Sequence, residues 1–129
     1  RCTYATVWAA SARPSPDQKA LTLAVQPIEG WCELWVWRQQ AQGWALDVLP
    51  PDGAEPALGY VEFAGWAPGA SGKLLVARES KVAGRVSRRF EVLRIDTLSA
   101  DKSASSVQQL PGFVQWADAG WKRGTVSLR

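Results

Sequence analysis

Acidic side chains are the residues of this 129-residue chain best placed by type and number to do chemistry. Its 12 Asp and Glu residues would permit a carboxylate pair, the arrangement with which glycosidases cleave sugars. Glu33 and Glu91 occupy matching places in two similar segments of the chain, which favours a structural role for both. The candidates on predicted strands are Glu33, Glu62, Glu79 and Glu91.

Other catalytic and cofactor-binding patterns find no support in the sequence. Histidine is absent, so the usual base of hydrolytic triads is missing, and two cysteines cannot supply a zinc site. The glycine-rich segment 65–69 precedes a predicted strand, whereas phosphate-binding glycine loops open a helix. We therefore expect a protein that is not an enzyme and that holds no cofactor or metal.

Tryptophan is unusually frequent, with 8 residues in this length. Exposed indoles stack on sugar rings or anchor protein interfaces, whereas buried indoles fill the core between sheets. Placement at the starts of predicted strands favours the core for most of them. The residues expected at a ligand or partner surface are Trp44, Trp66 and Trp121, which lie beside Gly or Pro turns, together with Arg88 and Arg89.

The two cysteines, Cys2 and Cys32, suit one disulfide in an oxidising compartment. Such a bridge would stabilise the fold by roughly 3 to 4 kcal/mol. Two free, buried thiols are the alternative. The chain has no Met, so removal of an export signal or other processing is expected before Arg1. These features predict a periplasmic or extracellular protein.

The overall composition is that of an ordinary globular domain. The formal charge is +3, and the 15 Lys and Arg residues are scattered instead of forming a basic face, so no nucleic-acid partner is expected. No apolar run reaches the ~18 residues that a transmembrane helix needs. The length fits a single domain spanning residues 1–129.

Short β-branched and aromatic segments alternate between apolar and polar positions, which predicts an all-β protein. Both faces of the segment 31–38 are largely apolar, as expected for a sheet covered on both sides. No helix is expected. The predicted strands are 3–9, 20–26, 31–38, 43–49, 59–64, 73–79, 87–95, 105–110, 113–117 and 124–128.

The chain contains an internal repeat with a period of about fifty residues. Residues 15–25 match residues 67–77, each a turn followed by a strand, and residues 32–37 match residues 90–95. A third similarity relates residues 60–63 to residues 113–116. The predicted units are about 3–50, 59–111 and 113–129.

The turn Ser15–Lys19, the segments 65–68 and 72–76, and the strand Phe90–Leu98 resemble repeats of the TolB-like β-propeller family. The second unit has Gly69 and extra residues where the family turn has Asp. The resemblance implies four-stranded antiparallel blades in a partial β-propeller, or in one that a homo-oligomer completes. A closed up-and-down β-barrel of about ten strands is the alternative.

Three functions are consistent with these patterns. The first is a non-catalytic interaction module of the cell envelope that binds a protein partner through its loops. The second is a carbohydrate-binding module that uses exposed tryptophans. The third is an accessory propeller portion of a larger enzyme.

Overall fold

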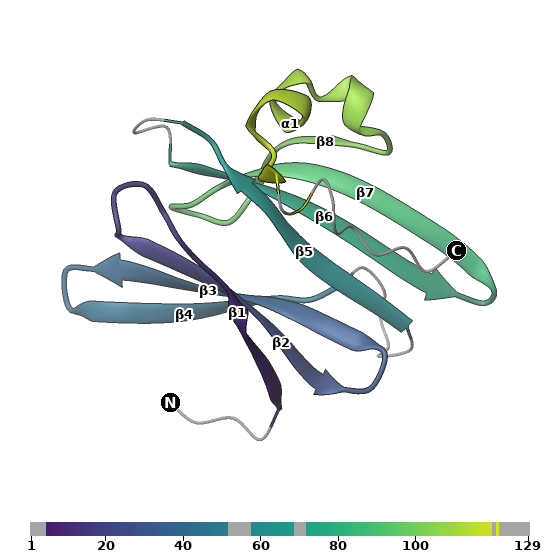
Figure 1. The fold of residues 1–129 in the computed structure, drawn as a ribbon, viewed down its shortest axis with the longest axis horizontal. Helices are drawn as coiled ribbons and strands as arrows, with labels where there is room; N and C mark the ends of the chain where they lie inside the picture. The colour runs from purple at the N-terminus through teal and green to yellow at the C-terminus, as the bar shows by residue number, and fades with distance from the viewer. Residues whose placement is uncertain (1–4, 52–57, 69–71, 120, 122–129) are drawn as a thin grey trace.

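The computed structural model describes residues 5–51, 58–68, 72–119 and 121, and within them the chain is all-β with one short helix (Figure 1). A 3₁₀ turn, Val107–Gln109, precedes the helix α1, Pro111–Trp116. The strands are β1 (Thr6–Pro14), β2 (Ala20–Ile28), β3 (Trp31–Gln40), β4 (Gly43–Leu49), β5 (Leu58–Trp66), β6 (Lys73–Val82), β7 (Arg85–Arg94) and β8 (Ala100–Ala104).

The strands form two antiparallel meanders, which we call the first meander (β1–β4) and the second meander (β5–β8). A parallel pairing between β3 and β5 joins them at Trp31 with Gly59 and Cys32 with Tyr60. The described strands therefore belong to one open sheet with β1 and β8 at its ends, rather than to a closed barrel. Figure 1 shows the two groups of strands side by side, with α1 beyond the second meander.

Seven predicted strands, those between residues 3 and 95, overlap β1 to β7, and β4 has the predicted bounds. The strands expected at 105–110 and 113–117 are wrong, because β8 ends at Ala104 and α1 follows the 3₁₀ turn. Pro111 favours the first turn of a helix, and the buried residues Leu110, Phe113 and Ala117 have helical spacing. The segment predicted at 124–128 lies outside the described residues.

Similar turns start the second strand of each meander. The backbone N–H of Ser15 donates to Ala20 O at 2.8 Å, and that of Ala67 donates to Lys73 O at 3.0 Å. In the first turn the Ser15 hydroxyl also donates to the carboxylate of Asp17 at 2.6 Å. Each turn therefore fixes where its β-ladder begins.

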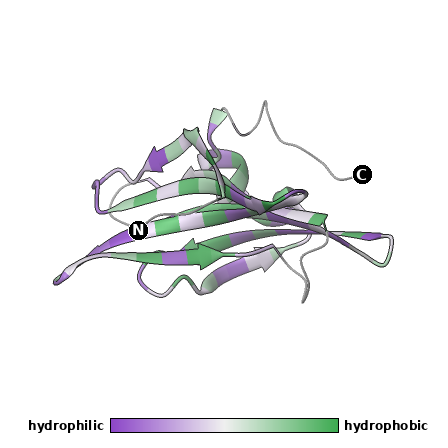
Figure 2. Ribbon diagram, turned by 90° about the horizontal axis from the view of Figure 1, so that it is seen from below, coloured by the Kyte–Doolittle hydropathy of each residue, from purple (hydrophilic) through white to green (hydrophobic). Residues whose placement is uncertain are grey.

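Two apolar clusters hold the molecule together, one on each side of the second meander. The first lies between the meanders and contains Leu34, Val36, Leu49, Val61, Leu74, Val76 and Leu93. The second lies beneath α1 and contains Ala64, Leu75, Ala77, Phe90, Val92, Leu110, Phe113 and Ala117. Strands β5 to β7 are thus covered on both faces. Figure 2 shows the corresponding alternation of apolar and polar segments along the strands.

Candidate functional site

A groove of about 650 Å³ lies where β3 and β5 separate after their short pairing. Its walls come from β1, β2, β3 and β5, and its end comes from Asp118 and Trp121 beyond α1. The register pairs Trp8 with Ala24 and Ala24 with Leu34, so these residues share the face of the first meander that lines the groove. The two meanders diverge after their short pairing and thereby create the groove.

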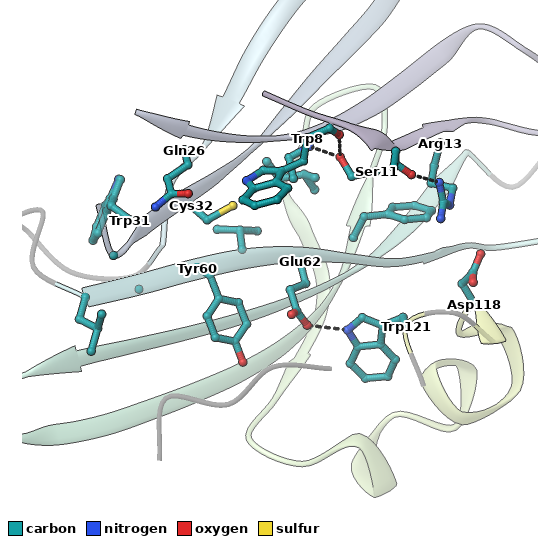
Figure 3. A pocket seen from close by; sticks show the side chains of 18 residues that line it. Trp8, Ser11, Arg13, Gln26, Trp31, Cys32, Tyr60, Glu62, Asp118 and Trp121 are labelled. Atoms are coloured by element: carbon teal, nitrogen blue, oxygen red, sulfur yellow. Dashed lines mark hydrogen bonds between the residues drawn. The ribbon is translucent and has the colours of Figure 1, made fainter. Parts of the chain in front are cut away.

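Aromatic side chains dominate this groove. Trp8 lies on the edge strand β1 with 54% of its surface exposed, whereas Trp31 is buried at the start of β3. The indole N–H of Trp121 donates to the Glu62 carboxylate at 2.8 Å, which fixes that ring. Figure 3 shows Trp8 beside Cys32 on one side of β5, and Glu62 with Trp121 on the other. The groove therefore has one accessible indole, Trp8, and two less accessible ones, Trp31 and Trp121.

Positively charged, negatively charged and neutral polar side chains also line the groove. Arg13 donates through Nη1 to the carbonyl oxygens of Ala10 and Ala12, both at 2.9 Å, so its guanidinium is held at the groove. The half-buried Gln26 amide and the carboxylates of Glu62 and Asp118 complete the polar part of the lining. The groove can therefore both donate and accept hydrogen bonds.

Cys32 lies half-buried in this groove, and its sulfur forms no disulfide within the described residues. Burial raises its pKa, and the negative charges of Glu62 and Glu33 raise it further. The thiol is therefore a poor nucleophile at neutral pH. Cys2 lies outside the described residues, so the predicted disulfide between Cys2 and Cys32 stays a prediction.

A second feature is an apolar face of the first meander that points away from the second, which we call the outer face. The register places Leu21 opposite Trp37, and Trp37 opposite Leu46, on this face. Trp44 is 54% exposed and Val48 is 42% exposed. No described residue of the second meander or of α1 belongs to it. The outer face consists of Val7, Leu21, Leu23, Val25, Trp35, Trp37, Trp44, Leu46 and Val48, of which Val25 is fully buried.

The residues expected at a binding surface lie in different places. Trp44 is on the outer face, Trp121 lines the groove, and Trp66 packs half-buried against Phe63 and the cluster between the meanders. Arg88 and Arg89 lie on β7 and form ion pairs with buried carboxylates. The structure therefore does not bring these five residues into one site.

Trp8, Arg13, Gln26 and Asp118 are among the groove residues that the sequence prediction missed. Trp8 lies among small residues on an edge strand and beside no Gly or Pro turn, so its sequence context carries no surface signal. Gln26 lies near the end of β2, at one of the polar positions that alternate with apolar ones along the strand. The β1–β2 register, which pairs Gln26 with Thr6 and Ala24 with Trp8, places Trp8 and Gln26 on one face of the first meander, and β5 completes the groove.

The four candidate carboxylates already have partners. Glu79 is 1% exposed and accepts hydrogen bonds from Tyr60 at 2.7 Å and from Arg88 at 2.6 and 3.0 Å. Glu91 is buried and lies 2.5 Å from Arg78 Nε. Glu33 accepts from the Trp35 indole at 3.3 Å, and Glu62 from Trp121. These contacts give all four acids a part in the fold.

Two further properties concern the described part of the chain. No group of three or more His, Cys, Asp or Glu side chains there could hold a metal ion. None of its helices has the length and apolar character to cross a membrane. Comparison of the chain with protein-family models, with curated proteins and with solved structures finds no match.

Proposed function

We propose that this protein is a non-catalytic interaction module of the cell envelope, and that a β-sheet of a protein partner packs on its outer face. The observation that carries the proposal is the apolar outer face, on which Val7, Trp44 and Val48 are exposed beside the half-buried Trp35 and Trp37, since exposed apolar patches mark interaction sites. Aromatic side chains are the residues that most often dominate binding energy.

The second meander supports the choice of a sheet as the occupant. Leu21 pairs with Pro14, the last residue of β1, and Leu74 pairs with Trp66, the last residue of β5. Because the turns before both strands close in the same way, Leu21 and Leu74 hold equivalent positions. Leu74 is buried against the first meander. The outer face of the first meander is therefore equivalent to the face of the second meander that packs against the first meander.

This equivalence supports stacking of the meanders face to back, as blades stack in a propeller. A second copy of the chain could not extend the stack, because α1 and residues around it cover the free face of the second meander. We therefore favour a different protein as the partner. Its docking surface is the sheet face rather than the loops that the sequence suggested, and a periplasmic or extracellular location remains part of the proposal.

Site-specific photo-cross-linking tests this function. A benzophenone amino acid replaces Trp44 in the protein expressed in its source cells, and cross-linked products are identified by mass spectrometry. The matched control places the same group at Val114, which is 56% exposed on α1. We expect one recurrent product, a β-sheet protein, from position 44 only.

The same cross-linked product from positions 44 and 114 would indicate non-specific encounters instead of docking on the outer face. Absence of a product from position 44, repeated with the group at Val48, would contradict the proposal.

A further inference from the structure

We propose that the groove between the meanders is a carbohydrate-binding site in which a pyranose ring of an oligosaccharide stacks on Trp8. This site is separate from the outer face, because the register places Trp8 and Trp44 on opposite faces of the first meander. It therefore does not depend on the protein partner proposed above.

Trp8 has the properties of a stacking platform. More than half of the indole surface is exposed, although the ring projects into a lined groove. The C–H face of a pyranose is apolar and matches an indole in width, so stacking removes apolar surface from water on both partners. The packed, hydrogen-bonded Trp121 lines the groove on the other side of β5 (Figure 3).

The polar lining favours a sugar over a purely apolar ligand. Pyranose hydroxyls donate and accept at once, and neighbouring hydroxyls bridge both atoms of a planar amide, guanidinium or carboxylate. Arg13, Gln26, Glu62 and Asp118 are four such planar groups around one groove. An acyl chain would leave them without new partners and remove their water, which costs free energy.

The size and shape of the groove agree with this ligand. A volume of about 650 Å³ lies within the range of ligand sites, and the walls end on the edge strand β1. An oligosaccharide could therefore bind with one ring on Trp8 and with its chain leaving the groove.

The test is a glycan array probed with the purified protein, followed by titration of the strongest array ligand while tryptophan fluorescence is recorded. We expect fluorescence to change on binding because an indole is covered. Trp8→Ala should weaken binding by at least about tenfold, and Gln26→Ala by about threefold to tenfold. Trp44→Ala is the matched control, since Trp44 is as exposed as Trp8 but lies on the outer face, and it should change affinity less than about twofold.

Circular dichroism melting curves establish that each variant is folded. An array without any bound glycan would overturn the proposal. Equal weakening by Trp8→Ala and Trp44→Ala would also overturn it, because the groove would then not be the site. Loss of glycan binding leaves the cross-linking result at position 44 unchanged, so the two proposals fail separately.

Discussion

Two of the four candidate carboxylates, Glu79 and Glu91, are buried and form ion pairs with arginines. Tyr60, Glu79 and Arg88 occupy neighbouring positions across β5, β6 and β7, since Tyr60 pairs with Glu79 and Glu79 pairs with Arg88. Burial, then the hydrogen bond to Glu79, raises the pKa of Tyr60. The sequence could not distinguish this role from catalysis, because only the register brings the three side chains together.

Arg88→Ala should destabilise the protein by about 2 to 3 kcal/mol, because Glu79 would keep its buried charge and lose its cation. The side chain of Arg88 is 26% exposed, which limits the loss. Chemical denaturation measures it. Arg94→Ala is the control, since the Arg94–Asp96 pair is exposed and should contribute nothing measurable. Replacing Arg88 by Met and Glu79 by Leu together should restore much of the stability. A cost for Arg88→Ala no larger than that of the control would contradict this role.

Stability should fall at alkaline pH through Tyr60. Its pKa is raised in the folded protein, so between the pKa of the unfolded state, near 10, and the folded value only the unfolded chain releases the proton. This release contributes up to about 1.4 kcal/mol of lost stability per pH unit. Tyr60→Phe should be less stable at pH 7 but should show a shallower decline above pH ~10 in urea unfolding. Parallel curves for the two proteins would exclude Tyr60 as the cause.

At the scale of elements, the sequence predicted strands β1 to β7 better than the helical segment that follows β8. Alternation identified β2 to β4 closely, and Leu34, Val36 and Leu49 of β3 and β4 lie in the core between the meanders. The internal similarity gave a wrong prediction at residues 113–116. These residues resemble residues 60–63, which form part of β5, but they lie in the helix α1. The helical spacing of the buried positions was the better signal.

Gly65 is the residue that lets α1 approach β5. A Cβ atom at this position would lie 2.5 Å from Trp116 O, and the N–H of Asp118 donates to Ala64 O at 2.6 Å. Gly65→Ala should therefore displace the end of the helix and cost about 1 to 3 kcal/mol. Thermal unfolding measures the loss, with the exposed substitution Gln115→Ala as a control that stays within about 0.5 kcal/mol. Equal melting temperatures for both variants would show that the contact is not tight.

At the scale of the whole molecule, the arrangement of the two meanders creates both candidate surfaces. The face of the first meander that meets the second also lines the groove, and its opposite face stays uncovered in the described residues. Sequence reasoning predicted apolar residues on both faces of β3 and selected Trp44. It could not predict the groove, because the short β3–β5 pairing is a contact between distant segments.

Replacing Trp44 and Val48 with Lys should leave stability within about 1 kcal/mol of the parent, because both side chains are already exposed. The same change should reduce binding of a dye that fluoresces on apolar surfaces. A large loss of stability on urea unfolding would show that these residues belong to the core.

The most direct test of the outer face is a calorimetric titration of the protein with the purified partner identified by cross-linking. Loss of two interface anchors should weaken binding by about a hundredfold in the variant with Trp44→Lys and Val48→Lys. Trp8→Ala should bind within about twofold of the parent, since Trp8 faces the groove. Equal affinity of the parent and the double variant would contradict docking on the outer face.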